Sequence, residues 1–437
     1  MSTTYSSNPL VFIETHGCKL NQADSMKLAK EFTDFGFVLS ETKDNADVYI
    51  LNTCTVTHVA DRKARQSVRS FKKKNTDSKV IVTGCYAERD QNELNAIPEI
   101  DMVLWNVKKK DIVKTIIEEF NYDSNDLAFE NSSNYLNFNL SRTRGMLKIQ
   151  EGCNQICSYC IVPKVRGREK SVQLRTLISN INSFVDDGFK EVVLTGTQLG
   201  SYGFDLEDMS LTKMVAAILD KTNIKRLRIS SLQPQELNQD LLSLWKDKRL
   251  CPHFHIPLQS GDDEILTKMR RRYSRETYLA SVDRVRSVID DASITTDIIV
   301  GFPDEDQSQF ENTRKVCEEV GFSDMHIFKF SSRPGTSAHY FKDNISPEIK
   351  NGRSSELIEI AQESYAKFRE SYDGKHMEVL WESPESLNSY QQYSSGLTNN
   401  YIRVRSDQIE KENTLKSVEL TFDDINPYGP MYTKNNI

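Results

Sequence analysis

Three cysteines lie close together in the middle of the chain. Cys153, Cys157 and Cys160 follow Gly152 with the spacing C-x3-C-x2-C. Three thiolates can bind three irons of a [4Fe-4S] cube and leave the fourth iron without a protein ligand. An open iron can bind a further molecule, so we predict that this loop is a catalytic iron–sulfur site.

Other uses of the same spacing are less consistent with the sequence. A bacterial ferredoxin has C-x2-C-x2-C and a fourth cysteine before a proline, and a structural zinc site has four closed ligands; neither pattern is present here. The three cysteines would also share one face of a helix. Pro163 and Gly167, together with Gly152 and an apolar strand-like stretch before the loop, disfavour a continuous helix.

Three further cysteines each end an apolar stretch in the first part of the chain. The stretches that look like buried parallel strands are residues 10–18, 46–54, 79–85 and 101–106. Segments of helical length and period separate them, which predicts an α/β fold with a doubly wound parallel sheet. Ligands of such sheets bind at the carboxyl ends of the strands. We therefore expect Cys18, Cys54 and Cys85 to converge there.

Two alternatives remain for these thiols. They are either buried structural cysteines, or ligands of a zinc ion with His16 or His58 as the fourth ligand. Cys251 and Cys317 have no such neighbours and are predicted to be ordinary buried thiols.

A second alternating series of apolar and helical segments follows. The apolar segments are residues 146–152, 191–196, 226–232, 254–260, 294–302 and 325–331. Six β-α units predict a partial (β/α)6 barrel of TIM type, with its active site at the carboxyl ends of the strands. Small or turn-forming residues stand at these ends: Thr195, Gly196, Ser230, Gln259, Ser260, Gly301 and Phe302. Each one, taken alone, fits an ordinary β-α turn equally well.

The remaining segments define the domain organisation. Residues 122–141 are rich in Asn, Ser and Asp and are predicted to be a linker, and a helix is predicted over 346–373. Short alternating segments at 377–383, 400–406 and 417–424, with a polar turn region at 384–399, predict a small C-terminal β-barrel. The predicted domains are residues 8–121, 142–373 and 374–437.

The cysteine triplet EGCNQICSYC (151–160) resembles the radical S-adenosylmethionine (SAM) superfamily. The resemblance implies that the open iron chelates the amino and carboxylate groups of SAM. It also implies that an electron from the cluster cleaves SAM to a radical that attacks an unactivated C–H bond, and that the strand-end residues given above line SAM. Many members have Gly-Gly-Glu at the second strand end, where this chain has Thr195-Gly196-Thr197-Gln198. The resemblance therefore does not assign the residue that contacts the SAM amino group.

Three motifs around the first cysteines are similar to those of the radical SAM methylthiotransferase family: THGCKLN (15–21), NTCTV (52–56) and TGCYA (83–87). This resemblance spans nearly the whole chain. It implies a second [4Fe-4S] cluster on Cys18, Cys54 and Cys85 that carries the sulfur to be inserted. It also implies that the C-terminal domain is a TRAM-like RNA-binding β-barrel.

Within the family, four segments look most like the branch that acts on threonylcarbamoyladenosine at position 37 of tRNA: NTCTVTHVADRKARQ, CPHFHIPLQSG, MRRRYS and ITTDIIVGFPDE. This branch places a methylthio group on carbon 2 of the base, using two SAM. The branches that act on isopentenyladenosine or on a ribosomal-protein aspartate remain alternatives. A non-catalytic or electron-transfer iron–sulfur protein is the alternative from another class.

Basic residues are candidates for tRNA contacts. They form the runs 72–74, 108–110 and 270–272 and a series from Lys164 to Lys170 that directly follows the cluster loop. Most such runs are solvated surfaces. The predicted substrate-binding residues are Arg166, Arg168, Arg270, Arg271, Arg272 and, in the C-terminal domain, Arg403. Arginine can bind the threonyl carboxylate through two parallel hydrogen bonds.

Composition limits the remaining possibilities. The net charge of -7 argues against non-specific coating of nucleic acid, so contacts with a tRNA anticodon loop must be local. The apolar runs are shorter than the roughly 20 residues that cross a bilayer, and the first residues lack a signal-peptide pattern. We expect a cytoplasmic enzyme that does not bind a membrane and that needs a cellular electron donor and a sulfur source.

Overall fold

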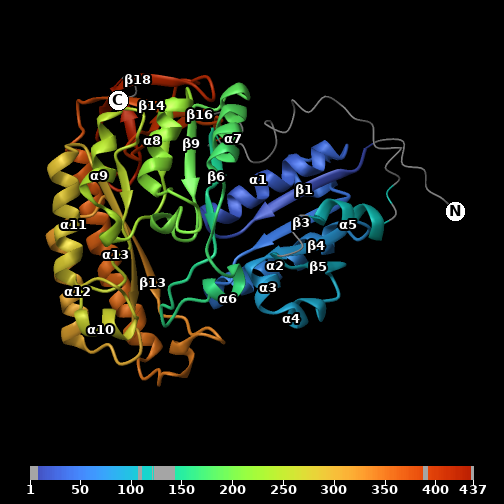
Figure 1. Ribbon diagram of the computed structural model, residues 1–437, viewed down its shortest axis with the longest axis horizontal. Coiled ribbons are helices and arrows are strands. Elements are labelled where there is room, and N and C mark those ends of the chain that lie inside the picture. Colours follow the sequence, from blue (N-terminus) through green and yellow to red (C-terminus); the bar gives the residue numbers. More distant parts are fainter. Residues whose placement is uncertain (1–7, 107–110, 121, 123–142, 387–391, 435–437) are drawn as a thin grey trace. The chain divides into compact units, whose positions relative to one another are not determined.

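The computed structural model describes residues 8–106, 111–120, 122, 143–386 and 392–434. The chain divides into two compact units (Figure 1). The first comprises Met1–Arg142, Glu151–Asn154 and Cys160–Arg168, and the second comprises Thr143–Gln150, Gln155–Tyr159 and Glu169–Ile437. Except for Tyr122, the predicted linker lies outside the described residues. Among the helices of these residues, none has the length and apolar character needed to span a membrane.

A five-stranded parallel sheet forms the centre of the first unit, in the order β2-β1-β3-β4-β5. Its strands are β1 (Leu10–Thr15), β2 (Val38–Leu39), β3 (Val48–Thr53), β4 (Lys79–Gly84) and β5 (Met102–Leu104). The two-residue strand β2 was not predicted, because so short a segment has no recognisable period.

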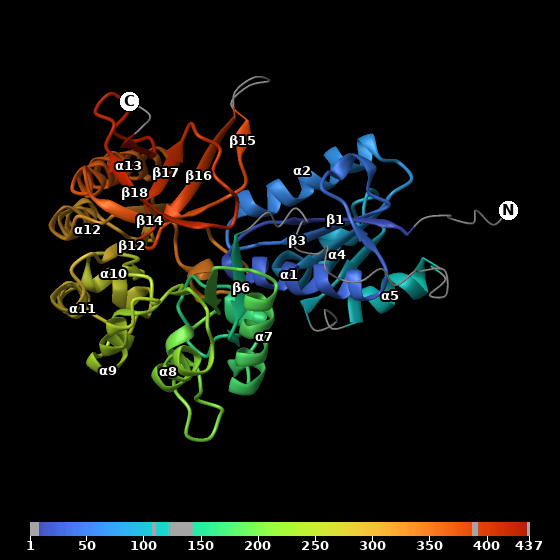
Figure 2. The same ribbon diagram turned by 90° about the horizontal axis from the view of Figure 1, so that it is seen from above.

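Helices cover both faces of this sheet (Figure 2). Strand β3 is buried on both sides: Val48 and Ile50 pack toward one group of helices, and Tyr49 and Leu51 toward the other. The first group is α1 (Lys19–Asp34) and α5 (Ile112–Glu119), and the second is α2 (His58–Lys74), α3 (Cys85–Arg89) and α4 (Gln91–Asn95). The predicted doubly wound sheet is confirmed.

Six parallel strands line the larger unit. They are β6 (Arg144–Lys148), β9 (Glu191–Thr195), β10 (Arg226–Ile229), β11 (His253–His255), β12 (Ser293–Val300) and β13 (Asp324–Lys329). They form two three-stranded sheets, and a parallel bridge between Ser231 and His255 joins them. The predicted partial barrel is confirmed by this arrangement.

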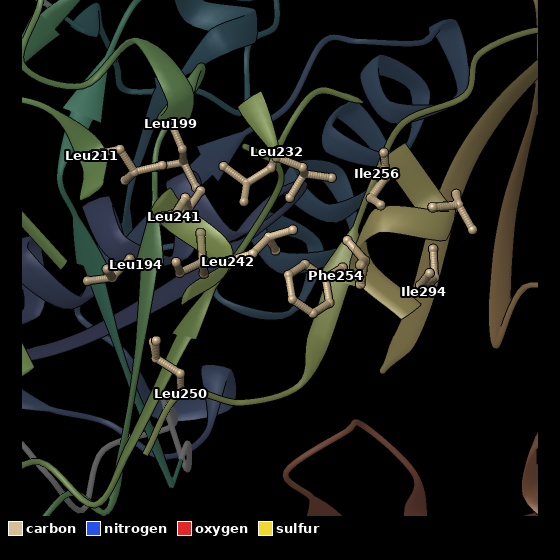
Figure 3. Close-up of a cluster of buried hydrophobic side chains, with 14 of the residues drawn as sticks. Leu194, Leu199, Leu211, Leu232, Leu241, Leu242, Leu250, Phe254, Ile256 and Ile294 are labelled. Carbon is tan, nitrogen blue, oxygen red and sulfur yellow. The ribbon is translucent and has the colours of Figure 1, made fainter. Parts of the chain in front are cut away.

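A large apolar core fills the space between these strands and the surrounding helices (Figure 3). Leu194, Phe254 and Ile294 on the strands pack with Leu211 and Leu242 on the helices. The helices are α7 (Leu174–Asp186), α8 (Leu211–Lys221), α9 (Gln239–Leu242), α10 (Asp263–Lys268), α11 (Arg275–Val288), α12 (Gln307–Val320) and α13 (Pro347–Glu370). Cys317 is fully buried in this core, and Cys251 is buried as well, as predicted.

The C-terminal region is a closed five-stranded barrel in the order β14-β18-β19-β17-β16, closed by pairing of β14 with β16. Its strands are β14 (His376–Trp381), β16 (Gln392–Thr398), β17 (Arg403–Ser406), β18 (Leu415–Thr421) and β19 (Met431–Thr433), and β15 (Glu385–Ser386) extends the edge of β16. The predicted small β-barrel is confirmed.

The prediction of a polar turn region over 384–399 is wrong for its second half, which forms β16. Ser394, Ser395 and Gly396 have a low preference for strands, so the local pattern did not reveal it. A Cβ atom on Gly396 would lie 2.5 Å from Val379 Cγ1. The close approach of β14 and β16 therefore requires glycine at position 396, a residue type that sequence patterns associate with turns.

Candidate active site and cluster-binding cysteines

The three N-terminal cysteines follow three adjacent strands. Cys18 lies between β1 and α1, Cys54 directly follows β3, and Cys85 begins α3 after β4. In a sheet of order 2-1-3-4-5, the chain reverses its winding between β1 and β3, and a crevice opens there at the carboxyl ends of the strands. The sheet order thus brings together thiols that are 31 to 67 residues apart.

These thiols are near enough to interact electrostatically. Burial and, to a smaller extent, the charges of Cys85 and Cys18 raise the pKa of Cys54, nearby backbone amides lower it, and the net result is a pKa of about 12. Three soft thiols at adjoining strand ends are a donor set that fits an iron–sulfur cluster. Cys18 is exposed and the other two are buried.

Glycines at this edge allow the close approach. Gly17 has φ of 100°, and a Cβ atom there would lie 2.6 Å from Cys54 Cβ. Gly84 has φ of 97°, and its Cβ would lie 2.5 Å from the carbonyl oxygen of Thr53. Both positions therefore need glycine for conformation and for space.

The candidate zinc histidines have other surroundings. His16 Nε2 is hydrogen-bonded to Glu14 at 2.7 Å. His58 lines a cavity of about 440 Å³ together with Val59, Asp61, Arg62, Arg65, Arg89 and Glu93. That lining contains no cysteine among the described residues.

Buried polar residues that the sequence did not reveal hold the cysteine loops. The Asn21 side-chain amide donates to the carbonyl oxygens of His16 at 2.7 Å and Thr53 at 2.9 Å. The Asn52 amide donates to the carbonyl oxygen of Asn21 at 2.9 Å. These bonds connect the loop that carries Cys18 with the end of the strand that precedes Cys54.

Arg166, a predicted tRNA-binding residue, lies inside the first unit. It is in α6 (Val162–Arg166), and its side chain is only 2% exposed. Its guanidinium donates to Cys85 Sγ at 3.3 Å, to Asp24 at 2.6 Å and to Glu151 at 2.7 Å, and also to Asn21 Oδ1.

The C-x3-C-x2-C segment is an irregular loop, and α6 begins only at Val162. The alternative of one continuous helix face is therefore wrong. Gly152 has φ of 78°, and a Cβ there would lie 2.0 Å from the carbonyl oxygen of Arg168. The Cys153 amide donates to the carbonyl oxygen of Gly167 at 3.1 Å. The glycines noted in the sequence therefore shape this loop.

The central part of the loop belongs to the second unit. Ser158 donates its amide to the Met269 carbonyl at 3.0 Å and its hydroxyl to the Lys268 carbonyl at 2.8 Å. Arg271 donates to Cys157 Sγ at 3.5 Å and to the Tyr273 hydroxyl at 3.0 Å. Of the predicted arginine run, Arg271 thus contacts a cysteine of the loop.

Five of the predicted SAM-lining residues end or directly follow strands of the second unit: Thr195, Gly196, Ser230, Gly301 and Phe302. Gln259 and Ser260 lie four and five residues beyond the end of β11, and Gln259 forms a parallel bridge with Ile298. Thr195 ends β9, Ser230 follows β10, and Gly301 follows β12 with φ of 67°. Gln259 also has a positive φ, 64°, and Ser260 and Phe302 are fully buried.

A buried polar network missed from the sequence lies beside these ends. Gln150 Oε1 accepts from the amides of Thr197 and Gln198, both at 2.9 Å. Gln198 also contacts Glu236, whose carboxylate accepts from the Gln233 amide at 2.8 Å. Burial raises the pKa of Glu236 to about 7. Thr197 and Gln198 belong to the segment that departs from Gly-Gly-Glu, so this network lies at the departure noted in the sequence.

The inner face of the barrel strands presents a second polar group. Phe254, Ile294 and Ile298 pack into the apolar core, so His255 and Asp297 point to the opposite face of their strands. His255 Nε2 and His326 Nδ1 each lie 3.2 Å from Asp297 Oδ1, and His255 Nδ1 lies 3.0 Å from the Ser231 hydroxyl. His326 is 56% exposed.

The other predicted tRNA-binding arginines are at the surface or paired. Arg168, Arg270 and Arg272 are exposed. Arg403 contacts Glu382 and donates to the Ser395 hydroxyl at 3.0 Å. Residues 108–110 lie outside the described part of the chain.

Comparisons with known proteins agree with these motifs. Residues 10–104 match the family described as uncharacterized protein family UPF0004, and residues 147–317 match the radical SAM superfamily. The chain is 32% identical to threonylcarbamoyladenosine tRNA methylthiotransferase MtaB of Bacillus subtilis, over 90% of this chain and 89% of that protein. It is 36% identical to the protein of the same name from Aquifex aeolicus, over 90% and 96%.

A differently named relative is nearly as similar. The tRNA-2-methylthio-N(6)-dimethylallyladenosine synthase of Clostridium botulinum is 34% identical over 85% of each chain. Among solved structures, the radical SAM methyltransferase TsrM of Kitasatospora setae, with cobalamin and a [4Fe-4S] cluster bound, has a TM-score of 0.55 at 14% identity, covering 76% of this chain and 77% of that one. This likeness concerns the fold alone.

Radical SAM membership implies SAM and a [4Fe-4S] cluster as cofactors, and the loop from Cys153 to Cys160 has the donors for that cluster. The relatives above exceed 30% identity over most of both chains. This chain is therefore an enzyme of the radical SAM methylthiotransferase family.

Proposed function

We propose that this enzyme adds a methylthio group to carbon 2 of threonylcarbamoyladenosine at position 37 of tRNA, using two SAM and two [4Fe-4S] clusters. The observation that carries the proposal is the similarity to relatives named for this substrate, at 32% and 36% identity over nearly the whole chain. Dimethylallyladenosine is the second candidate substrate, because a relative named for it is 34% identical.

In this proposal Cys153, Cys157 and Cys160 hold the radical SAM cluster. The bound cluster and SAM supply the removal of a hydrogen atom from an unactivated C–H bond, which side-chain acids and bases cannot perform. The irregular loop allows three thiols to face one cube, and Ser158 fixes the middle of the loop through two hydrogen bonds to main-chain groups. The residues at the strand ends would line SAM.

Cys18, Cys54 and Cys85 would hold the second cluster, which carries the sulfur. Two features support this role: the three thiols share the ligand-binding edge of the sheet, and glycines give them room. An open iron on that cluster is where a sulfur source would deliver its atom. A cellular electron donor would supply the reducing equivalents.

Polar side chains on the inner face of the barrel favour a polar substrate over an apolar one. Threonylcarbamoyl carries a carboxylate, a hydroxyl and amide groups, whereas dimethylallyl is apolar. His255, Asp297 and His326 offer hydrogen-bond donors and an acceptor on the face of the sheet opposite the core. An apolar substituent against such groups would cost about 1 to 3 kcal/mol for each group left unpaired. We infer that these three residues contribute to substrate recognition.

One experiment tests the substrate. The anaerobic enzyme is incubated with SAM, reductant and sulfide, together with tRNA carrying threonylcarbamoyladenosine, dimethylallyladenosine or unmodified adenosine at position 37. Nucleosides are then analysed by mass spectrometry. We expect a methylthio product from the first tRNA only. Reaction of the dimethylallyl form alone, or of a ribosomal protein and no tRNA, would contradict the substrate assignment and leave the family assignment intact.

A further inference from the structure

Arg166 is a buried cation that directly touches one of the N-terminal cysteines. Its Nε–H donates to Cys85 Sγ at 3.3 Å, while the two other guanidinium nitrogens are bound by Asp24 and Glu151 on one side and by Asn21 on the other. All of these residues belong to the first unit. No step of the proposed reaction involves this guanidinium.

We propose that Arg166 is a positioning residue for the N-terminal iron–sulfur cluster, whose reduction potential it raises through a directed N–H···S hydrogen bond to Cys85. The inference rests on the proposed function, because it takes Cys85 as a ligand of that cluster. This positioning role replaces the predicted role of Arg166 in binding the threonyl carboxylate of the tRNA substrate.

The geometry fixes the direction of this hydrogen bond. A guanidinium is a rigid planar fork, so its orientation is set once its terminal nitrogens are bound. Asp24 and Glu151 accept from Nη1 at 2.6 and 2.7 Å, and Asn21 accepts from Nη2. The Nε–H is consequently aimed at the sulfur. Partners of metal ligands that act in this way orient the ligand and tune the metal.

Burial makes the charge effective. The Arg166 side chain is 2% exposed, so water and salt screen its charge poorly. An arginine guanidinium is not deprotonated in proteins, and the carboxylates of Asp24 and Glu151 lie 2.6 and 2.7 Å from Nη1. The residue therefore remains a cation.

A cation and a donor at a ligand sulfur favour the more negative state of a cluster. One-electron reduction adds a negative charge to the cube, and hydrogen bonds to its sulfurs are among the known determinants of its potential. Asp24 and Glu151 oppose this effect with their own charges, but Arg166 is the group in hydrogen-bond contact with the sulfur. The net effect we expect is a higher potential.

The same side chain connects two functional loops. Glu151 precedes Cys153 by two residues, and Cys85 follows β4. Arg166 thus holds the start of the radical SAM loop and a ligand of the N-terminal cluster through one rigid group. The potential of one cluster and the position of the other loop consequently depend on one residue.

The test isolates the N-terminal cluster. In the full-length chain, Cys153→Ala, Cys157→Ala and Cys160→Ala together remove the radical SAM cluster. Two variants are compared in this background: Asp24→Asn alone, which keeps Arg166, and Asp24→Asn with Arg166→Gln, which removes it. Neutralising Asp24 in both avoids leaving a buried carboxylate without its cation. After anaerobic reconstitution, iron content is measured and the potential is determined by dithionite titration followed by electron paramagnetic resonance.

We expect about four irons per chain in both variants, as one cube requires. The variant without Arg166 should have a more negative midpoint potential and a changed resonance spectrum. Arg168→Gln is the matched control, because Arg168 is exposed and lies in the same segment. It should leave the potential unchanged.

Equal potentials with and without Arg166 would overturn the inference. If the variant with Asp24→Asn and Arg166→Gln binds no cluster, Arg166→Lys is tested in its place, because lysine keeps the charge but lacks the planar fork. A midpoint potential below that of the variant that keeps Arg166 would support the directed hydrogen bond. An identical potential would overturn it. If the variant that keeps Arg166 binds no cluster through the N-terminal cysteines, the two-cluster part of the proposed function fails instead.

Discussion

The guanidinium carbon of Arg228, in strand β10, lies 4.2 Å from the centre of the Tyr401 ring, just before β17. The His253 ring also stacks on the Tyr401 ring, with 4.3 Å between the ring centres. Arg228 also donates to the carbonyl oxygen of Asn399 at 3.1 Å. The ring of Tyr401 therefore packs the C-terminal barrel against the parallel strands of the larger barrel, and the two are structurally coupled.

Removing this ring should destabilise the second unit. Tyr401→Ala loses a cation–π contact, a ring stack and buried area, for which we expect a loss of about 2 to 4 kcal/mol. Differential scanning calorimetry should show a lower Tm. Tyr428→Ala is the control, because Tyr428 is 51% exposed in the same region. A Tm that falls equally in both variants would contradict a specific role for Tyr401.

Glu191 should make stability depend on acidic pH. Its carboxylate is fully buried and accepts from Arg228 Nε at 2.8 Å. Burial acts to raise the pKa of Glu191, but Arg228 and its neighbours Arg144 and Arg226 lower it below the ordinary value. The folded-state pKa is thus depressed. The stabilisation is present above the unfolded pKa and is lost as the pH falls through the folded one.

Glu191→Gln should therefore cost about 3 to 5 kcal/mol at neutral pH, because it leaves Arg228 buried without its counter-charge. The difference in unfolding free energy between parent and variant should shrink as the pH falls below roughly 4. Chemical denaturation at a series of pH values measures it. Glu311→Gln, at a partly exposed ion pair with Arg314, should change little. A difference that does not depend on pH would show that the pair does not contribute through ionisation.

The cysteines should divide into two functional groups. Anaerobically reconstituted enzyme should contain about eight irons. Cys153→Ala, Cys157→Ala or Cys160→Ala should abolish reductive cleavage of SAM, whereas Cys18→Ala, Cys54→Ala or Cys85→Ala should still release 5'-deoxyadenosine without forming the methylthio product. Chromatography of the products and iron analysis test both statements. Cys317→Ala, in the apolar core, should keep all of the iron. Full methylthiolation by the N-terminal variants would disprove the division of labour.

Glycine at position 84 should be needed for the N-terminal cluster. Gly84→Ala places a Cβ 2.5 Å from a backbone oxygen at φ of 97°, which shifts the turn between β4 and Cys85. We expect about four irons to remain, with SAM cleavage intact. Gly352→Ala, in α13 with open space around it, should keep about eight irons and be stabilised by roughly 0.5 to 1 kcal/mol. Eight irons in Gly84→Ala would refute the close-packing argument.

His326 should affect substrate selection more than SAM chemistry. If it donates to the threonylcarbamoyl group, His326→Ala should lower kcat/KM for that tRNA by about tenfold, the equivalent of one hydrogen bond of about 1.4 kcal/mol. SAM cleavage without tRNA should be unchanged. His376→Ala, at an exposed site in β14, is the control. An equal loss of activity in both variants, or no loss in either, would exclude His326 from recognition.

Much of the site followed from local sequence. The spacing of Cys153, Cys157 and Cys160 and the glycine before them limit the chemistry and the loop shape, because turn conformation and metal-ligand type depend on a few neighbouring residues. Apolar stretches that alternate with helical periods predicted the parallel strands of both units, and the ends of three of these stretches located Cys18, Cys54 and Cys85.

The tertiary structure alone decided which distant residues meet. Arg166 and Asn21 are 145 residues apart, and His255 and Asp297 are 42 apart on different strands. Such pairs depend on strand order, register and side-chain direction, which no local period encodes. Strand β16 was missed for the same reason: its Ser and Gly residues resemble a turn, and only pairing with β14 and β17 makes them a strand.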